Sequence, residues 1–268
     1  MTRRARVDAE LVRRGLARSR QQAAELISAG RVQIDGMPAA KPATTVSVDA
    51  KLTVAADERV WVSRGAHKLI GALEAFGVSV TGRRCLDAGA STGGFTEVLL
   101  DRGAAEVVAA DVGYGQLAWS LRSDDRVQVL ERTNVRSLTP DLIGGPVDLI
   151  VADLSFISLA TVLPALTSCA SPQADIVPMV KPQFEVGRHG LGRRGVVRSA
   201  AHRRGALIGV LQEITDRGLA VLAVLPSRVT GGEGNREYLV HATRASAVGL
   251  SWQALVRTVD DLILEEEQ

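Results

Sequence analysis

The sequence predicts an α/β protein in two parts: a doubly wound, mainly parallel sheet preceded by a small N-terminal α+β unit. From residue 64 onward, apolar segments of strand length alternate with helical patterns, which is typical of a parallel sheet covered on both faces. Hydrophobic residues make up 46% of the 268 residues, enough to build a core. The first 41 residues hold nine Lys and Arg against four Asp and Glu, so they carry +5 whereas the remainder carries −3.

The composition disfavours a membrane-spanning chain and a disulfide-rich one. No apolar stretch approaches the roughly 20 residues that a membrane helix needs. Asp8 and Glu10 stand where a signal peptide would be apolar, so we expect a cytoplasmic protein without an obligatory membrane partner. Cys85 and Cys169 are too few for a disulfide framework or a zinc cluster. We expect them to be small buried side chains, and we expect no metal site.

The N-terminal elements follow from local signals. Residues 7–14 have the pattern of a short amphipathic helix. Ser19 is placed to cap a second helix, and Gly30 to end it. Residues 32–34 alternate as a strand, and Asp35-Gly36 is a strong signal for a two-residue hairpin turn. Two helices and a hairpin within about 45 residues form a compact unit.

This unit concentrates arginine around one turn. Arg14, Arg18 and Arg20 flank the connection between the two predicted helices, so they can project together. Such a cluster favours a polyanionic partner, although a solvated charged surface gives the same pattern. Aromatic residues are only 3% of the chain, which favours contacts to a nucleic-acid backbone and its shape over base stacking.

Four motifs in this region resemble the S4 RNA-binding domain: Leu16-Ala17-x-Ser19-Arg20-x-x-Ala23, Ile27-x-x-Gly30-x-Val32, Asp35-Gly36 and Lys41-Pro42. The resemblance covers residues 4–58 and implies contacts with structured RNA, without identifying which RNA. We assign residues 1–58 to this domain, 59–63 to a linker with Trp61 packing at the junction, and 64–268 to a second domain. The residues expected to contact RNA are Arg4, Arg6, Arg14, Arg18, Arg20 and Lys41.

The second part alternates regularly along the chain. Helices are expected over residues 66–76, 95–102, 116–121, 160–169, 200–217 and 252–264. Strands are expected over residues 84–87, 106–111, 127–130, 147–153, 175–181, 219–225 and 238–242. Folds of this Rossmann-like class bind ligands at the carboxyl ends of their strands, and the polar motifs below stand at or near those ends.

A glycine-rich turn follows the first strand of this part. Gly89 and Gly94 fit a G-x-G-x-x-G fingerprint, but Ser91 occupies the middle position, where a pyrophosphate needs room. Asp87 would repel phosphates and could favour a cationic ligand. S-adenosylmethionine carries a sulfonium and an ammonium group, so it matches better than NAD. Asp111 closes the next strand and can take ribose hydroxyls; a purely structural turn stays an alternative.

Further polar and aromatic residues extend this candidate site. Asn134 is placed to contact an adenine ring or to form a turn, and Phe156 to stack on a ligand ring or to pack in the core. The expected residues of the S-adenosylmethionine site are Asp87, Gly89, Ala90, Ser91, Thr92, Gly93, Gly94, Phe95, Asp111, Asn134, Asp153 and Phe156.

Asp153 and Lys181 end two successive buried strands, so they should face one crevice. A structural ion pair would explain both, because a buried charge needs a partner. Lys68 lies on the first helix of this part, and Glu237 enters a late strand. Spacing alone does not join Lys68 and Glu237 to the first two residues.

A resemblance does join them. The motifs Gly65-Ala66-His67-Lys68-Leu69, Ala152-Asp153-Leu154-Ser155, Val180-Lys181-Pro182-Gln183-Phe184 and Gly234-Asn235-Arg236-Glu237-Tyr238 resemble the FtsJ-type ribose 2′-O-methyltransferases. The resemblance implies a catalytic tetrad of Lys68, Asp153, Lys181 and Glu237. An S4 domain before such a body is similar to the TlyA family. That family methylates cytidine ribose in RNA of the small and/or large ribosomal subunit, is tied to capreomycin and viomycin susceptibility, and carries a haemolysin label.

The tetrad residues suit this chemistry. A ribose 2′-hydroxyl must lose its proton as it attacks a methyl group, and a lysine serves as base when burial and a nearby cation lower its pKa. We therefore expect Lys181 to be the general base, Lys68 to lower its pKa or steer the hydroxyl, and Asp153 and Glu237 to orient the lysines. The residues expected to hold RNA around the site, unless they are ordinary surface charges, are Arg64, Arg132, Arg136 and Arg188.

Two functions of other classes stay open from the sequence: a membrane-active haemolysin, and an RNA-binding assembly factor with an inactive body. The absence of an apolar span disfavours the first, and the complete tetrad disfavours the second. We expect a monomer whose partners are ribosomal RNA and ribosomal subunits.

Overall fold

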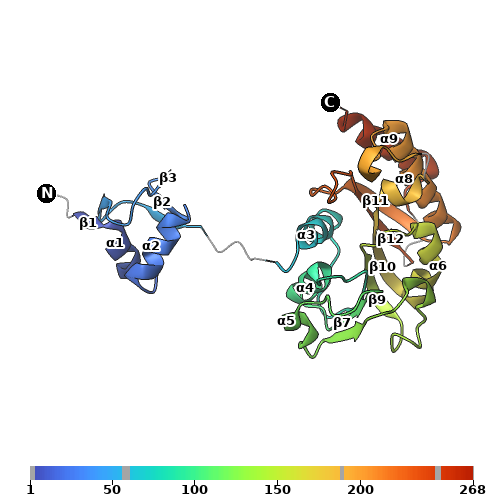
Figure 1. Cartoon of the computed structure of the whole chain (residues 1–268), viewed down its shortest axis with the longest axis horizontal. Helices are drawn as coiled ribbons and strands as arrows, with labels where there is room; N and C mark the ends of the chain where they lie inside the picture. The colour runs from blue at the N-terminus through green and yellow to red at the C-terminus, as the bar shows by residue number, and fades with distance from the viewer. Residues whose placement is uncertain (1–3, 56–60, 188–189, 245–248, 268) are drawn as a thin grey trace. The chain divides into compact units, whose positions relative to one another are not determined.

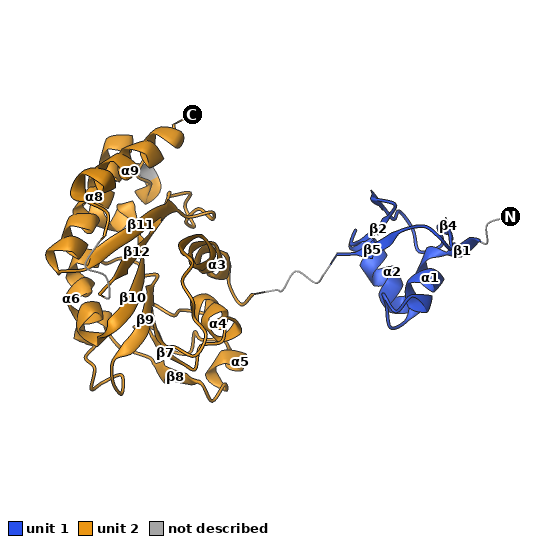
Figure 2. Cartoon of the chain, turned by 180° about the vertical axis from the view of Figure 1, so that it is seen from behind, with its two compact units in different colours: residues 1–60 blue, residues 61–268 orange. Residues whose placement is uncertain are grey.

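The structure, a computed structural model, describes residues 4–55, 61–187, 190–244 and 249–267. The chain divides into two compact units, residues 1–60 and residues 61–268, coloured blue and orange in Figure 2. Each unit has its own hydrophobic core. Trp61 and Val62, expected in a linker, pack against the core of the second unit.

The N-terminal unit places two helices beside two small sheets. Its elements are β1 (Arg4–Arg6), α1 (Val7–Arg13), α2 (Arg20–Ser28), β2 (Val32–Ile34), β3 (Met37–Pro38), β4 (Thr45–Ser47) and β5 (Leu52–Val54). Strand β1 pairs with β4, and β2 lies between β3 and β5, all antiparallel. Val7, Leu11 and Ile27 form part of the core between the helices and the strands.

Local signals of the N-terminal unit are confirmed. The Ser19 side chain accepts a hydrogen bond from the backbone N–H of Gln22, so it caps α2 as expected. Asp35 and Gly36 have φ of 50° and 86°, the left-handed pair that a two-residue hairpin turn requires. Strands β4 and β5 were not expected, because three residues are too short to show alternation above chance.

The second unit is built on a seven-stranded sheet of order β11-β12-β10-β9-β6-β7-β8. The strands are β6 (Arg84–Ala88), β7 (Glu106–Ala110), β8 (Val127–Leu130), β9 (Val147–Ala152), β10 (Ala170–Val180), β11 (Ala220–Pro226) and β12 (Tyr238–Thr243). Strands β8, β7, β6, β9 and β10 run parallel to one another, whereas β12 runs antiparallel to both β10 and β11. This confirms the doubly wound, mainly parallel α/β fold.

Helices cover both faces of this sheet (Figure 1). One face packs on α3 (Gly65–Phe76), α4 (Gly94–Asp101) and α5 (Trp119–Arg122). The other packs on α6 (Leu159–Cys169), α8 (Ala200–Asp216) and α9 (Trp252–Glu265). Three short helices, η1 (Val135–Ser137), α7 (Pro182–Glu185) and η3 (Arg193–Gly195), lie in the connections. Both cysteines are buried and free, as expected.

Two expected boundaries in the second unit are wrong. The helix expected over residues 116–121 is the single turn α5, which begins only at Trp119, after a loop that contains Gly115 at a φ of 68°. Strand β10 begins at Ala170 rather than at residue 175, with a register shift before Asp175. Pro172 stands in that early segment, and proline is unusual inside a strand, which hid its start from pattern reasoning.

The strand order reverses at β6, because the next strand in sequence, β7, lies on one side of β6 and the later strand β9 lies on the other. In such sheets the switch point opens a crevice at the carboxyl ends of the strands. Ala88 of β6 and Ala152 of β9 are paired in register at that edge. In the part of the chain that the structure describes, no helix is long and apolar enough to cross a membrane.

Candidate active site

The first ion pair of the site spans two neighbouring strands. Asp153 directly follows β9, and Lys181 directly follows β10, which is parallel to β9. Lys181 Nζ lies 2.6 Å from Asp153 Oδ1 and donates a hydrogen bond to Ser155 Oγ at 3.0 Å. The lysine side chain is only 10% exposed. The hydrogen bond to Ser155 and the close contact with Asp153 together restrict the position of Nζ.

The second ion pair brings together residues that are distant in the sequence. Lys68 Nζ on α3 donates to Glu237 Oε2 at 2.5 Å, and Gln183 Nε2 donates to Glu237 Oε1 at 3.3 Å. The side chains of Lys68 and Glu237 are 10% and 3% exposed. Burial of each charge is offset by its partner, so the two pairs together add no net charge to the site.

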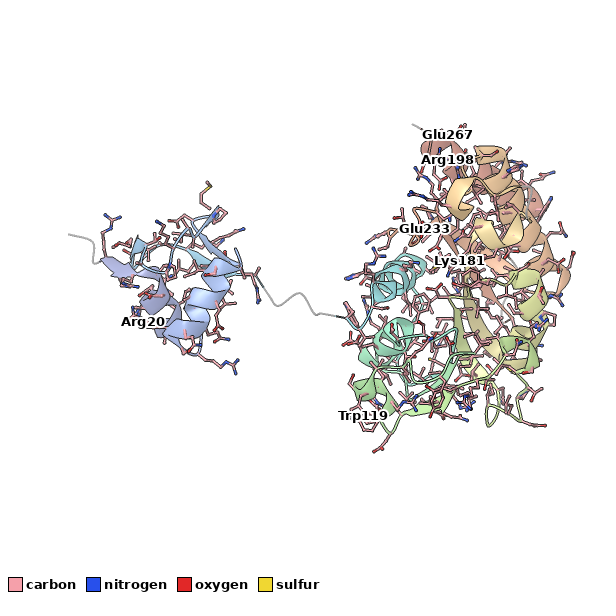
Figure 3. All side chains as sticks on the ribbon, in the orientation of Figure 1. Arg20, Trp119, Lys181, Arg198, Glu233 and Glu267 are labelled. Carbon is pink, nitrogen blue, oxygen red and sulfur yellow. The ribbon has the colours of Figure 1, made fainter. Side chains whose placement is uncertain are left out.

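All four tetrad residues line connected cavities. Lys68, Asp153 and Lys181 line a cavity of about 300 Å³, and Lys68, Lys181 and Glu237 line a second of about 770 Å³. Lys181 and Glu233, both labelled in Figure 3, lie on the wall of the larger cavity. The structure therefore assembles the tetrad that the resemblance implied, as two buried ion pairs facing a common space.

The loop between β11 and β12 makes room for Glu237. A Cβ on Gly231 would lie 2.6 Å from Glu237 Oε1, so a larger residue there would push on the carboxylate. Asn235, buried in the same loop, accepts from the backbone N–H of Val197 and donates to the carbonyl of Gly195. Neither residue was singled out from the sequence; three glycines within four residues, Gly231, Gly232 and Gly234, were the available signal.

The glycine-rich turn closes over the ends of β6 and β9. Gly89 has a φ of 91°, and a Cβ there would lie 2.6 Å from the carbonyl oxygen of Asp153, so only glycine fits. The carboxylate of Asp111 accepts hydrogen bonds from the backbone N–H groups of Ser91 and Gly113 at 2.8 and 2.7 Å. Asp111 therefore fixes the turn and also stands on the wall of the adjoining cavity.

That adjoining cavity, of about 600 Å³, is the candidate ligand site. Its lining includes Gly89, Ser91, Asp111, Asn134, Asp153 and Phe156 from the expected set. Gly89, Ser91 and Asp153 also line the 300 Å³ tetrad cavity, so the two spaces adjoin. Of the other expected residues, Ala90, Thr92, Gly94 and Phe95 line the tetrad cavity, whereas a Cβ on Gly93 would meet Leu117 and Leu121.

Asp87, in β6, is not among the residues that line these cavities. It is fully buried, and Thr96 Oγ1 donates to its Oδ2 at 2.7 Å. Oδ1 has no hydrogen-bond partner among the described residues. Burial raises the pKa of Asp87 to about 7. The unpartnered Asp87 oxygen next to the glycine-rich turn, together with Asp111 and Asp153 on the cavity wall, fits a cationic nucleoside better than a pyrophosphate, because carboxylates attract positive charge and repel phosphate.

Asn134 and Phe156 occupy the rim of this cavity. The Asn134 side chain accepts from the backbone N–H of Arg136 and so begins η1; it acts as a turn former and lines the cavity at the same time. Phe156 is 90% exposed, at a φ of 63°, with its ring centroid 5.1 Å from that of Phe184. The core position considered for Phe156 is therefore wrong, and its ring is available to a partner.

The arginines expected to hold RNA near the site have different settings. Arg64 lines the tetrad cavity, and Arg136 lines the ligand cavity. Arg132 stacks on the ring of Tyr114 at 4.2 Å. Arg188 lies outside the described residues. Arg194, which the sequence reasoning missed, lines the 770 Å³ cavity.

In the N-terminal unit, the basic residues expected to contact RNA separate into an exposed group and one that bonds within the fold. Arg4, Arg18 and Lys41 are exposed, and Arg20, labelled in Figure 3, has a side chain that is 59% exposed. Arg14 instead donates to the carbonyls of Ala50 and Val48 and pairs with Glu10, which commits its donors to the fold.

The fold and the site together define a Rossmann-like methyltransferase body, with a Lys-Asp-Lys-Glu tetrad beside a nucleoside-sized cavity, in a chain that also carries a small basic unit. The model of the FtsJ-like methyltransferases matches residues 61–244, and that of the S4 domain matches residues 5–52. The chain belongs to the TlyA family of S4-containing, FtsJ-like methyltransferases.

Three comparisons place it among known proteins. The chain is 65% identical, over 99% of both chains, to the 16S/23S rRNA (cytidine-2′-O)-methyltransferase TlyA of Mycobacterium tuberculosis strain H37Rv. It is similar to a solved structure from Streptococcus thermophilus described as a candidate hemolysin, with 36% identity, a TM-score of 0.72, and coverage of 100% and 98% of the two chains. A candidate S-adenosylmethionine-dependent methyltransferase from Listeria monocytogenes shares the fold at 14% identity and a TM-score of 0.51, over 67% of this chain and 97% of that one.

Proposed function

We propose that the protein methylates the 2′-hydroxyl of a cytidine ribose in ribosomal RNA, with S-adenosylmethionine as the methyl donor. The observation that carries the proposal is the pair of buried Lys–carboxylate contacts at the switch point of the sheet, next to a cavity of nucleoside size. The name of the M. tuberculosis relative supports the substrate class. A cytoplasmic location follows from that substrate.

The ligand cavity supplies what the methyl donor needs. Gly89 and Ser91 bring backbone close to the ligand, Asp111 offers carboxylate oxygens to the ribose, and Asn134 and Phe156 stand where the adenine would lie. When bound, S-adenosylmethionine supplies an electrophilic methyl group on a sulfonium that leaves as a neutral thioether. Asp153 lines both this cavity and that of the tetrad, so it marks where the two reactants meet.

Lys181 acts as the proton acceptor. Lys181 lies beside Asp153 and is bonded to Ser155 on the wall of the cavity in which the attacking hydroxyl would bind. Lys181 would first release its own proton to solvent, and its neutral amine would then take the hydroxyl proton onto Nζ as the 2′-oxygen attacks the methyl group that S-adenosylmethionine would supply. The resulting ammonium is then stabilised by the carboxylate of Asp153 at 2.6 Å.

Lys68 and Glu237 position the ribose. Their ion pair lines the same 770 Å³ cavity as Lys181, and Gln183 donates to the second carboxylate oxygen of Glu237. Because Glu237 accepts a hydrogen bond on each carboxylate oxygen, it keeps the Lys68 amine in place during the reaction. A near-attack geometry requires such fixed positions.

The basic groups around the site hold the RNA. Arg64 and Arg136 line the two catalytic cavities, and Arg4, Arg6, Arg18, Arg20 and Lys41 provide phosphate contacts on the N-terminal unit. We assign residues 1–58 to RNA binding and 64–268 to catalysis, in a protein that acts as a monomer. Methylation by this protein is expected to raise susceptibility to capreomycin and viomycin.

The test is methyl transfer by Lys181→Ala to ribosomal subunits from cells that lack the gene. We expect methylation, read by primer extension at low nucleotide concentration, to fall by at least 100-fold, as is usual for a general base. S-adenosylmethionine binding by calorimetry should stay close to that of the parent. Lys51→Ala, which changes an exposed lysine of the N-terminal unit, is the matched control. Full methylation by Lys181→Ala would sink the assignment of the base.

A further inference from the structure

Two carboxylates are buried in the most basic part of the molecule. Asp8 and Glu10, both on α1, are 4% and 1% exposed. Each accepts hydrogen bonds from two arginines: Asp8 from Arg6 and Arg20, and Glu10 from Arg13 and Arg14. Unlike the exposed Glu25, Asp35 and Asp49, these two acids are therefore not free surface charges, since they are bonded to arginines.

Asp8 gathers arginines from two different elements. Arg6 belongs to β1, and Arg20 is the first residue of α2. Their Nη2 atoms lie 2.8 and 2.9 Å from the same oxygen, Asp8 Oδ2, while Arg6 Nε donates to Oδ1 at 3.1 Å. The backbone N–H of Ala9 also donates to Oδ1, which fixes the carboxylate itself. One buried group thus sets the positions of two guanidinium groups.

Those two guanidinium groups keep donors for a partner. The side chains of Arg6 and Arg20 are 50% and 59% exposed. A guanidinium has five N–H donors; Arg6 uses two nitrogens on Asp8, and Arg20 uses one. Donors already held in place lose less conformational freedom on binding than free side chains do. The arrangement suits a phosphate group, which accepts bonds from paired guanidiniums.

Glu10 forms a contrast on the same helix. Its partner Arg14 also donates to the carbonyls of Ala50 and Val48, and that arginine side chain is only 22% exposed. The Glu10 contacts therefore connect α1 to the segment between β4 and β5. Through Arg14 they stabilise the unit, whereas both arginines at Asp8, like Arg13 at Glu10, present charge to solvent.

We propose that Asp8 is a positioning residue for RNA binding, which holds Arg6 and Arg20 side by side as a single phosphate-binding pair. The inference rests on the proposed function, because it assumes that the N-terminal unit binds RNA. It gives an acidic residue a favourable role in binding a polyanion. The guanidinium of Arg6, and then that of Arg20, holds the pKa of Asp8 well below its usual range, so the carboxylate stays ionised at neutral pH.

The test is Asp8→Asn in the full-length protein, with equilibrium binding to ribosomal subunits that lack the methyl group. If net charge alone governs binding, removing an acid from a basic unit strengthens it. The positioning role predicts the opposite sign: affinity about 5- to 10-fold weaker, a raised KM for subunits, and an unchanged kcat at saturating subunits. Asp49→Asn, which removes an exposed carboxylate of the same unit, is the control and should leave affinity equal or slightly higher.

A double-mutant cycle separates positioning from simple loss of folding. In the Arg20→Ala background, Asp8→Asn should cost less than half of its effect in the parent, because one of the two arginines that it positions is gone. Additive effects, or an affinity that equals or exceeds that of Asp49→Asn, would overturn the proposal. Failure of the parent protein to bind subunits would instead refute RNA binding, and with it the function on which the inference rests.

Discussion

The two units use the same chemical contact, an ion pair with a buried carboxylate, in opposite ways. In the N-terminal unit the acids Asp8 and Glu10 are buried while three of their four arginine partners are half or more exposed. In the body, Glu237 and Lys68 are both buried. The first arrangement turns positive charge outward, where a polyanion can bind it. The second hides both charges, where they can orient reactants without attracting solvent.

Net charge therefore has to be considered separately for each unit. An overall charge of +2 describes neither unit. In the N-terminal unit, counting acids against bases underestimates the charge offered to a partner, because its two buried acids hold arginines at the surface. In the body, the tetrad adds nothing to the net charge and yet supplies all of its candidate catalytic groups.

The largest effect is expected from breaking the ion pair between Lys68 and Glu237. Glu237→Gln leaves Lys68 buried without a charged partner, so we expect the free energy of unfolding to fall by about 3 kcal/mol and methyl transfer to fall at least 100-fold. Chemical denaturation and the methylation assay measure the two. Asp260→Asn, which breaks a contact to Arg204 with both side chains about 40% exposed, is the matched control. It should leave both stability and activity close to those of the parent. Equal destabilisation by the two variants would contradict the contrast.

A smaller effect is expected from the loop that makes room for Glu237. Gly231→Ala places a Cβ 2.6 Å from Glu237 Oε1 and should displace the carboxylate from Lys68. We expect kcat to fall about 10- to 100-fold, with little change in affinity for ribosomal subunits. Gly232→Ala is the control on the next residue, where an added Cβ would meet nothing within 4 Å. Equal activities of the two variants would show that the loop does not position Glu237.

The fold was largely predictable because its signals are local. Alternating apolar strands and helices placed the core of each major element of the body, and Ser19 and Asp35-Gly36 marked a cap and a turn. Elements of three residues, such as β4 and β5, were missed because they are too short to show a period. The early part of β10 was missed because Pro172 interrupts its pattern.

The site was predictable only in part, since strand direction is not a local property. Asp153 and Lys181 end successive parallel strands, so sequence placed them together. Glu237 stands at the beginning of β12, and only the antiparallel pairing of Tyr238 with Val180 puts that beginning beside the end of β10. Lys68 lies 169 residues from Glu237, and a family resemblance was needed to join them. The roles of Asp8 and Gly231 depend on close contacts that the sequence does not encode at any fixed spacing.

Asp87 gives a pH-dependent test within the body. Its pKa in the folded state, about 7, lies above its ordinary value of 3.8, so the buried carboxyl destabilises the fold progressively as pH rises from about 4 to 7. Asparagine does not titrate. We therefore expect the stability of Asp87→Asn relative to the parent to rise by about 3 kcal/mol as the pH is raised from about 5 to about 8. Thermal unfolding at the two pH values measures this gain, and a pH-independent difference would contradict it.

The smallest effect on RNA binding is expected from replacing Arg20, and Arg204 of the second unit provides the comparison. Arg20 and Arg204 are alike in structure: each pairs with one carboxylate, and their side chains are 59% and 42% exposed. They differ in setting, since Arg20 belongs to the basic unit and shares its carboxylate with Arg6. We expect Arg20→Gln to weaken binding to ribosomal subunits a few-fold, and to reduce the slope of log affinity against log salt by about 1, the share of one phosphate contact. Arg204→Gln should leave both quantities unchanged. A titration of each variant at several salt concentrations measures the slopes, and identical slopes would mean that the ion pair at Asp8 serves the fold of the N-terminal unit alone.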